Sequence, residues 1–259
     1  MKNTIPLLTV VILAAGGSGL SHADDLTVIS NVTTNGKPSG TETNYISSEH
    51  IRTSRSEGSE VIIDLKTGVM TNINDKKKTY FVVTKQDLQD MQAKLAERMN
   101  DPRMKQAMAA MQGMTAEMSS SAEVKKTGVT RNVAGFACDE WVITMSSMMS
   151  MTECVTSDFK YPVASLQAMA EFGESMRKSM SAFGPSAKAG AELAEKLKGI
   201  KGYPVATSTV IDAGITKTTT AMEVTEVRHQ SIAASTWEPP AGFSKVDNPM
   251  LKGLQDHGR

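Results

Sequence analysis

Methionine and cysteine are the residue types whose number and spacing in this chain could support a chemistry. The chain holds 18 methionines against 6 phenylalanines. Methionine is unbranched, flexible and polarizable, so surfaces rich in it suit ligands or partners of variable shape. Most of the methionines fall in three blocks, over residues 91–118, 145–151 and 169–180. These blocks predict an adaptable apolar binding site.

Two of the blocks have the spacing of helices with one apolar face. The methionines of residues 102–118 lie on one side of an α-helix, and those of residues 166–183 share a face with a leucine and a phenylalanine. We predict that these side chains line a cavity for a lipid, an acyl chain or another apolar ligand. The predicted ligand-binding residues are Met104, Met108, Met111, Met114, Met118, Met169, Met176 and Met180.

Three other interpretations of the methionines remain open. Apolar stripes at helical spacing usually fill an ordinary interface between a helix and a sheet. Thioethers are also soft ligands for Cu(I), and Met108, Met111 and Met114 share one helix face. Met145 and Met148 are a second, freer pair near a predicted turn. Alternatively, the methionine-rich helices bind another protein of the cell envelope.

The sequence contains no catalytic motif. It has no H-E-x-x-H, no G-x-S-x-G and no glycine-rich phosphate loop. His50, His229 and His257 are far apart in the chain and stand in no ligand-spaced motif. We therefore predict a protein that is not an enzyme and that has no catalytic residues, cofactor or resident metal.

Cys138 and Cys154 are the only cysteines in the chain. An even pair without a C-x-x-C motif, in a chain that is predicted to be exported, indicates a structural disulfide. By closing the loop between the two cysteines, such a bridge stabilises the folded state by about 3 kcal/mol in the chain-entropy model.

A hairpin centred on Ser146 would bring the two cysteines face to face. The same register opposes Trp141 to Met151 and Ile143 to Met149. Because side chains alternate along a strand, the hairpin should have one buried face and one wetter face. The buried face is predicted to hold Trp141, Ile143, Met149 and Met151, and the wetter face Cys138, Glu140, Thr152 and Cys154.

The N-terminus has the pattern of a cleavable signal peptide. Lys2 precedes an apolar run over residues 5–15, and Ser21-His22-Ala23 fits a small-x-small cleavage site. We predict a signal peptide over residues 1–23 and a periplasmic or secreted mature protein. The apolar run is shorter than the roughly 20 residues of a transmembrane helix, and no later run approaches that length, so no transmembrane segment is predicted. Because the formal net charge is 0, we predict no nucleic-acid partner either.

Strand patterns fill the first third of the chain and return after each helical stretch. Runs with period-2 alternation and many β-branched residues, separated by short turns, predict an antiparallel meander. Gly68 fits the left-handed position of a hairpin loop, and residues 35–40 and 75–78 are predicted turns or loops. Besides the cystine hairpin, we expect strands at 26–34, 45–53, 60–65, 69–73, 79–83, 124–133, 203–211 and 215–228, and an extended closing segment at 235–246.

Two helical segments interrupt these strands. The first is predicted as two helices, 85–99 and 102–118, because Asp101 is a good N-cap and Pro102 a good first helical residue. The second covers residues 163–198.

The expected fold class is α+β. We predict a single β-rich domain over residues 24–247, built as one curved antiparallel sheet, with helical insertions at about 85–118 and 163–198 on its concave face. Residues 248–259 are predicted to be a flexible tail.

Several motifs, taken in their order along the chain, resemble those of a known family. They are IIDLKTG at 62–68, DKKKTY at 75–80, GFACDEW at 135–141, GYPV at 202–205 and WEPPAGF at 237–243. Together they resemble a family of uncharacterised exported bacterial proteins, a domain of unknown function. That family is similar in turn to the periplasmic lipoprotein carriers of the LolA type.

The resemblance covers residues 25–246 and implies a LolA-like fold. Such a fold is an unclosed antiparallel β-barrel in which helices plug a concave apolar face, where the carriers hold acyl chains. The helical insertions of this chain are longer and richer in methionine than those of the carriers. No residue matches a defined acyl-chain contact, so the resemblance assigns no binding residue.

Overall fold

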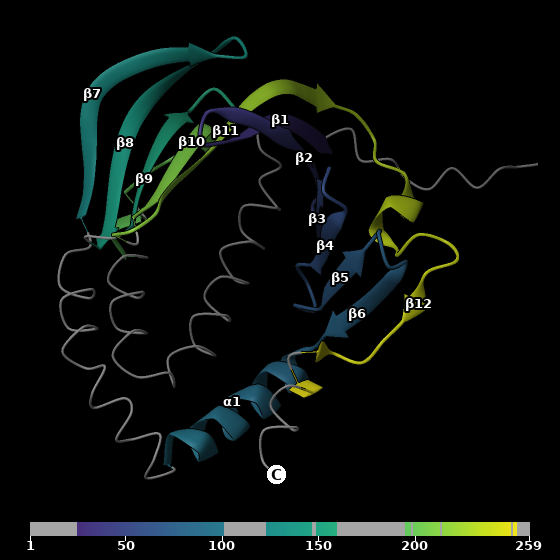
Figure 1. Cartoon of the computed structure of the whole chain (residues 1–259). Coiled ribbons are helices and arrows are strands. Elements are labelled where there is room, and N and C mark those ends of the chain that lie inside the picture. The colour runs from purple at the N-terminus through teal and green to yellow at the C-terminus, as the bar shows by residue number, and fades with distance from the viewer. Residues whose placement is uncertain are drawn as a thin grey trace, which may run out of the picture.

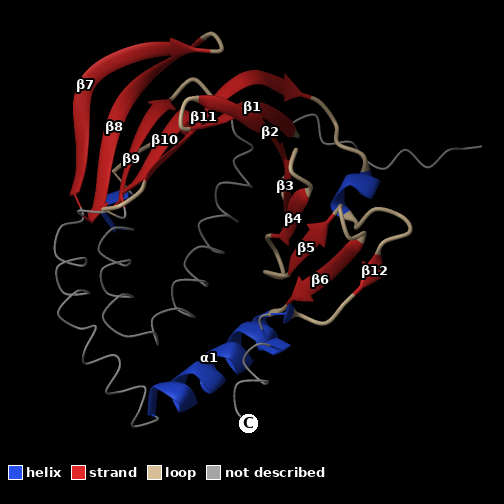
Figure 2. Cartoon of the chain, viewed as in Figure 1, coloured by secondary structure: helices blue, strands red, loops and turns tan. Residues whose placement is uncertain are grey.

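The structure is a computed structural model that describes residues 25–100, 123–146, 149–159, 195–197, 199–212, 214–249 and 251–252. Most of these residues form β-strands (Figure 2), beside one long helix, α1 (Lys85–Asn100), and a short 3-10 helix, η2 (Ala234–Trp237). The strands are β1 (Leu26–Thr34), β2 (Lys37–Ile46), β3 (His50–Arg55), β4 (Ser59–Asp64), β5 (Met70–Asn74), β6 (Thr79–Val83), β7 (Glu123–Val133), β8 (Phe136–Ser146), β9 (Met149–Thr156), β10 (Tyr203–Asp212), β11 (Lys217–His229) and β12 (Ser244–Lys245).

One sheet holds all of the described strands, in the order β12-β6-β5-β4-β3-β2-β1-β11-β10-β9-β8-β7. Neighbouring strands are antiparallel, except that β12 lies parallel to β6. β1 joins the two halves, because it pairs with β2 on one side and with β11 on the other. The sheet bends into an arch whose end strands, β7 and β12, do not pair with each other (Figure 1). The predicted curved, unclosed antiparallel sheet is confirmed, although the described part of the chain is mostly β rather than α+β.

The first hairpin is tighter than the sequence predicts. In place of a loop over residues 35–40, only Asn35 and Gly36 connect β1 to β2, and β2 already begins at Lys37. Both turn residues have positive φ angles, 51° and 74°. Two positive φ angles are what a type I′ turn requires, and its twist matches the twist of the strands that it joins. Gly68 has the predicted left-handed backbone, with a φ of 73°.

The single strand predicted at 45–53 is divided between β2 and β3. The division falls at Ser47, whose hydroxyl accepts hydrogen bonds from the backbone N–H groups of Glu49 at 3.3 Å and His50 at 2.9 Å. A short polar side chain that bonds to the backbone in this way stabilises a turn within a run of strand-forming residues.

Helix α1 confirms the predicted helix 85–99 and ends one residue later. It begins with a reciprocal cap, in which Thr84 Oγ1 accepts from the N–H of Asp87 at 3.1 Å and the Asp87 carboxylate accepts from the N–H of Thr84 at 2.7 Å. This arrangement satisfies two N–H groups that a helix start otherwise leaves without partners.

Most of the remaining helical prediction lies outside the described residues. The predicted helix 102–118 is wholly outside them, and of 163–198 only residues 195–197 are described, as helix. Of the predicted tail 248–259, the structure describes residues 248, 249, 251 and 252.

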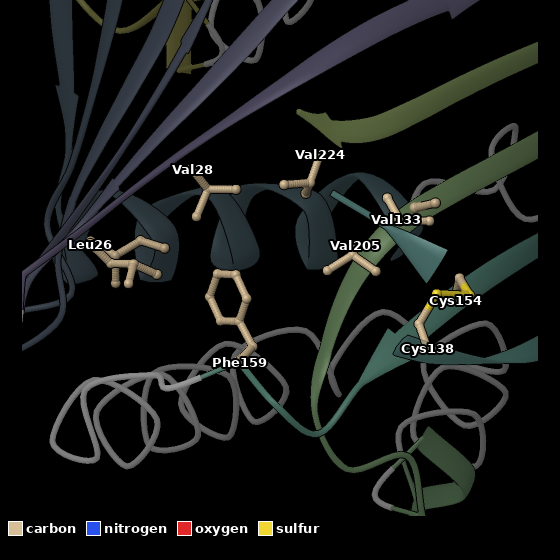
Figure 3. Close-up of a cluster of buried hydrophobic side chains, with 10 residues drawn as sticks. Leu26, Val28, Val133, Cys138, Cys154, Phe159, Val205 and Val224 are labelled. Atoms are coloured by element: carbon tan, nitrogen blue, oxygen red, sulfur yellow. A yellow bond between two sulfur atoms is a disulfide. The ribbon is translucent and has the colours of Figure 1, made fainter. Parts of the chain in front are cut away.

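The main buried cluster lies along the central strands. β1 contributes Leu26 and Val28, β10 contributes Val205 and β11 contributes Val224. Phe159, just after β9, points its ring toward Val28 (Figure 3) and is itself buried. The core therefore rests on aliphatic side chains from strands that are distant in sequence.

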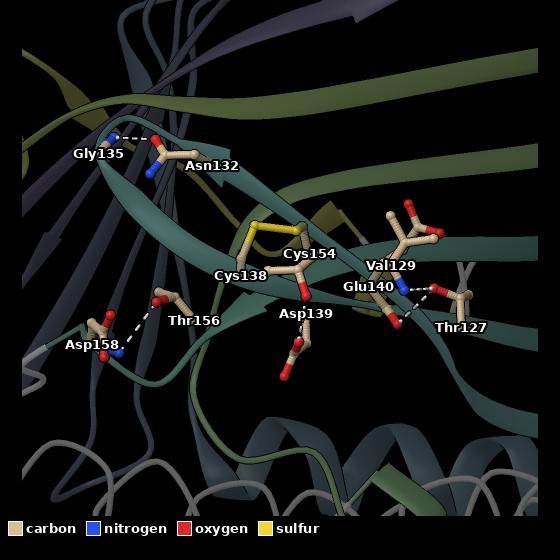
Figure 4. Close-up of a disulfide and its surroundings, with 11 residues drawn as sticks. Thr127, Val129, Asn132, Gly135, Cys138, Asp139, Glu140, Cys154, Thr156 and Asp158 are labelled. Atoms are coloured by element: carbon tan, nitrogen blue, oxygen red, sulfur yellow. Dashed lines mark hydrogen bonds between the residues drawn. A yellow bond between two sulfur atoms is a disulfide. The ribbon is translucent and has the colours of Figure 1, made fainter.

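The predicted disulfide between Cys138 and Cys154 is confirmed. It links β8 to β9 with a Cα–Cα distance of 5.2 Å (Figure 4). The side chains are 2% and 0% exposed, so the prediction that they lie on the wetter face is wrong. The reason is that Val133 and Ala206 belong to the same buried cluster as the two cysteines.

The register of the cystine hairpin differs by two residues from the prediction. Trp141 lies opposite Glu153 and Ile143 opposite Met151, because the ladder is irregular just after Thr144. A slip of two residues returns every side chain to the same face of the strand. Trp141 and Ile143 therefore still share a face, on which Ile143 is fully buried and Trp141 is half-buried.

Residues 230–246, which follow β11, run along the outer side of the arch (Figure 1), and we call them the closing segment. It begins after β11 and, contrary to the predicted extended segment, forms η2 before it pairs as β12 with β6. The edge of the sheet at β6 is thus covered by the chain's own C-terminal region.

The closing segment is held on β3 by an aromatic and an ionic contact. The ring of Trp237 stacks on His50 with centroids 5.3 Å apart. Arg52 donates one hydrogen bond to the carbonyl of Thr236 at 2.7 Å and another to the carboxylate of Glu60 at 2.6 Å. The side chains of Arg52 and Glu60 are 12% and 8% exposed, so this ion pair is buried beneath the segment.

Candidate functional site

The residues of the predicted methionine site lie outside the described residues; they are Met104, Met108, Met111, Met114, Met118, Met169, Met176 and Met180. The same holds for Met148 and for the side chain of Met145. His50 lies in β3 and His229 in β11, and His257 is outside the described residues. Within the described part of the chain, no three His, Cys, Asp or Glu side chains gather as metal ligands, and no helix is long and apolar enough to cross a membrane.

The described residues form a groove of about 530 Å³ near the Thr34 end of β1 and the adjoining parts of its neighbouring strands. We call it the inner groove. Its wall consists of residues 39–42 and 55–57, and its floor is Val32, Thr34, Thr207, Thr209, Thr220 and Met222.

The groove faces the inside of the arch. Side chains alternate between the two faces of a strand, so Arg55 points away from the face of β3 that carries His50 and Arg52. The face that carries His50 and Arg52 is covered by the closing segment, which runs on the outside of the arch (Figure 1). Arg55 and the groove that it lines therefore lie on the inner face.

The floor of the groove is two rows of side chains across three strands. One row is Val32, Met222 and Thr207, which are neighbours across β1, β11 and β10. The other row is Thr34, Thr220 and Thr209 on the same strands. Because neighbouring strands lie about 4.8 Å apart, each row presents its side chains at that spacing. The floor thus combines apolar surface with regularly placed hydroxyl groups.

Three of these hydroxyl groups have no hydrogen-bond partner among the described residues. Thr207, Thr209 and Thr220 make no side-chain hydrogen bond with any residue that the structure describes, whereas Thr34 donates to Ser39 at 3.1 Å. A threonine hydroxyl can donate one hydrogen bond and accept two. The floor can therefore bind polar groups of a ligand without breaking a contact within the described chain.

The wall of the groove contains an ion pair that is fixed from behind. Arg55 Nε donates to one oxygen of Glu42 at 2.7 Å, and the amide of Asn44 donates to the other at 3.1 Å. Thr53 in turn donates to the Asn44 carbonyl oxygen at 2.6 Å, which holds the amide in place. Glu42 is buried and Arg55 is half exposed, and among the described residues nothing accepts a hydrogen bond from the terminal amino groups of Arg55.

Aromatic side chains occupy the opposite end of the inner face. Phe159 stacks on Tyr203 with centroids 4.2 Å apart, and Phe136 lies tilted against Phe159 at 5.5 Å. Burial, together with the negative charge of Glu42, raises the pKa of Tyr203 to about 12. The phenol therefore stays protonated even at an alkaline pH at which a free tyrosine ionises.

Glu153 is a further polar group on the inner face. It lies on β9 between Trp141 on β8 and the groove residue Thr207 on β10. Burial raises the pKa of its carboxyl group, and within the described chain no side chain donates a hydrogen bond to it. Its carboxylate is thus partly desolvated without a compensating partner in that part of the chain.

The groove is not predicted by the sequence. A weak signal was present, since Thr207 and Thr209, like Thr218 and Thr220, follow the period of a strand. That period shows which threonines share a face of their own strand. It does not show that β10 and β11 lie beside β1, which is nearly the whole chain away in sequence.

The described residues form an arched, unclosed β-sheet with a groove on its inner face. The chain belongs to the family described as a domain of unknown function (DUF4412), whose model matches residues 29–243. The resemblance to such a family is therefore confirmed. No curated protein sequence matches the chain.

Several solved structures are distantly similar. An uncharacterized conserved protein from Thermus thermophilus shares 6% identity, over 87% of this chain and 91% of that one, with a TM-score of 0.45. MucB in the Pseudomonas aeruginosa MucA/MucB complex shares 13% identity, over 86% of this chain and 59% of that one, with a TM-score of 0.41. PNGF-II shares 10% identity, over 89% of this chain and 32% of that one, also at 0.41. Similarity at this level assigns no function, and the likeness to lipoprotein carriers stays a prediction.

Proposed function

We propose that this protein is an exported, non-enzymatic binding protein that holds a lipid or another amphiphile on the inner face of its arched sheet. The observation that carries the proposal is the continuity of that face. Along β1 the inner side chains pass from Leu26 and Val28 in the core, through Ser30, to Val32 and Thr34 in the groove. One strand therefore presents an apolar surface at one end and a polar, hydroxyl-bearing surface at the other.

The neighbouring strand β11 repeats this gradient. Val224 belongs to the core, while Met222 and Thr220 lie on the groove floor. A groove of about 530 Å³ is within the usual range for small-molecule sites, roughly 300–1,000 Å³. An acyl chain laid along the apolar rows would leave its polar end among the threonines. The eight methionines named from the sequence are, in this proposal, further contacts of the apolar part.

Export is supported by the signal-peptide pattern and by the disulfide. Cys138 and Cys154 are bonded and buried in the core cluster. Structural disulfides of this kind persist in oxidising compartments such as the periplasm or the extracellular space. A binding role without catalysis is supported by the chemistry of the inner face. Tyr203 keeps its proton, and the Glu42 carboxylate is already engaged on both oxygens.

A displacement assay tests the proposal. The purified full-length mature protein is loaded with an uncharged fluorescent apolar probe, N-phenyl-1-naphthylamine, and the probe is titrated out with an unlabelled, uncharged monoacylglycerol. The variant Val32→Asn with Met222→Gln removes the apolar part of the groove floor, and both side chains are only half-buried. Losing two apolar contacts should weaken probe binding by about tenfold.

The matched control is Val129→Asn on β7, which removes an apolar side chain that is 47% exposed and does not line the groove. The control should bind the probe as the unaltered protein does. Probe binding that is absent from the unaltered protein, or that is equally strong in the groove variant, would overturn the proposal.

A further inference from the structure

The polar part of the inner groove indicates which kind of head group it can hold. Within the described chain, its available donors and acceptors include the hydroxyl groups of Thr207, Thr209 and Thr220 and the terminal amino groups of Arg55. The hydroxyl groups can donate or accept, whereas the guanidinium can only donate. A complementary ligand must therefore offer several acceptors together with hydroxyl-type donors.

The charges of the groove decide against an anionic head group. Among the described residues that line it, Arg55 is the one cation, and Glu42 and Glu57 are acidic. The charge of Arg55 is largely balanced by Glu42, whose carboxylate lies 2.7 Å away. A phosphate or carboxylate entering the groove would meet two like charges and a guanidinium that is already paired, so its desolvation would not be offset.

The groove does not favour a cationic head group either. Both oxygens of Glu42 accept hydrogen bonds from Arg55 and Asn44, and one oxygen of Glu57 accepts from Ser59 at 3.1 Å. An ammonium group would also lie beside the guanidinium of Arg55. The groove thus favours a polar group that carries no net charge.

We propose that the threonine hydroxyl groups of the groove floor, together with Arg55, bind the uncharged, polyhydroxylated head group of an amphiphile, such as the sugar of a neutral glycolipid. The apolar part of this inference rests on the proposed function. The head-group part rests on the groove alone. Hydroxyl groups of a sugar exchange hydrogen bonds with Thr209 and Thr220, and a ring or glycosidic oxygen accepts from Arg55.

The test compares ligands with the same tail. Isothermal titration calorimetry measures binding of octyl β-glucoside, octyl phosphocholine, octyl phosphate and octanoate to the full-length mature protein, each below its critical micelle concentration. Octyl β-glucoside should bind at least tenfold more tightly than octyl phosphate or octanoate. Methyl β-glucoside, which lacks the tail, reports the head group by itself.

Matched variants locate the contact. Thr209→Val with Thr220→Val removes two hydroxyl groups without changing side-chain shape and should weaken octyl β-glucoside binding by about tenfold, with octanoate unaffected. Thr33→Val, on the other face of β1, is the control and should change nothing.

The outcomes separate the two claims. If all octyl ligands bind equally, or if the double valine variant binds the glucoside normally, the head-group inference is wrong while the proposed function stands. If the glucosides bind with and without the tail at equal strength and octanoate does not bind, the inference holds and the apolar-ligand proposal fails. Preference for octyl phosphate would overturn the charge argument.

Discussion

Replacing Gly202 by alanine should destabilise the protein far more than an ordinary glycine substitution. Gly202 precedes β10 and has a φ of 129°, a conformation that is nearly confined to glycine. A Cβ atom at this position would lie 2.2 Å from the carbonyl oxygen of Thr156 and 3.0 Å from Cγ1 of Val155. Thr156 is fully buried, so the backbone that the methyl group meets cannot move aside cheaply.

The magnitude follows from two terms. The strained backbone costs about 1–3 kcal/mol, and an extra methyl group in a packed region costs a further 1–3 kcal/mol or so. Gly202→Ala should therefore lower the free energy of unfolding by about 4 kcal/mol, a large part of the roughly 5–15 kcal/mol that a domain has. Equilibrium unfolding in urea, followed by circular dichroism and tryptophan fluorescence, measures the change.

Gly36→Ala is the matched control. Gly36 also has a positive φ, 74°, but a Cβ atom there would have no atom within 4 Å. Only the cost of the strained backbone applies, so the free energy of unfolding of this variant should fall by about 1–2 kcal/mol. If Gly202→Ala is no less stable than Gly36→Ala, the close approach between the start of β10 and the end of β9 is not as described.

Three further predictions concern other contacts. Replacing Cys138 and Cys154 together by alanine should lower the free energy of unfolding by about 3 kcal/mol, and a reducing agent should lower the urea midpoint of the unaltered protein but not of this variant. Arg52→Ala should cost about 3–5 kcal/mol because it leaves the Glu60 carboxylate buried without its ion-pair partner. Adding Glu60→Gln should restore part of that loss in the same urea titration, and no restoration would argue against the ion pair. Burial raises the pKa of Glu153 in the folded state. The folded protein therefore keeps this proton to a higher pH than the unfolded chain does. Stability is lost as the pH rises from about 4.5 through the folded pKa. Glu153→Gln should therefore raise the urea midpoint at pH 7 and leave it unchanged at pH 4, and equal midpoints at pH 7 would contradict the burial of this carboxyl group.

Local pattern was sufficient to predict many of the elements. The alternation in β1 gave its boundaries, and the spacing of apolar residues gave α1 to within one residue. The antiparallel meander followed from short turns between alternating runs. In each of these cases the side chains that decide the structure lie within a few residues of one another.

The misses have local causes as well. Asn35-Gly36 is a strong two-residue turn signal, and the following Lys37-Pro38 obscured the start of β2. Ser47 ends β2 through bonds from one hydroxyl group to the backbone, although the surrounding residues favour a strand. The irregular ladder after Thr144 shifts the register of the cystine hairpin by two residues, and no residue type in this turn predicts such an irregularity.

The groove could not be predicted for a different reason. Its floor exists because Thr34, Thr220 and Thr209 come together when β1 pairs with β11 and β11 pairs with β10. Its wall depends on the pairing of β2 with β3, which sets Arg55 beside Glu42. The floor requires strands from opposite ends of the chain to pair, and the wall requires the turn at Ser47 that divides β2 from β3, so no pattern in the sequence predicted either contact.

Mass spectrometry of lipids extracted from the protein, purified from its own cell envelope without detergent, tests the central claim most directly. An amphiphile should be recovered with the unaltered protein, and it should be lost or strongly depleted in the variant Val32→Asn with Met222→Gln. A preparation that carries no more lipid than this variant does would contradict the claim that the inner face of the arch is a binding site.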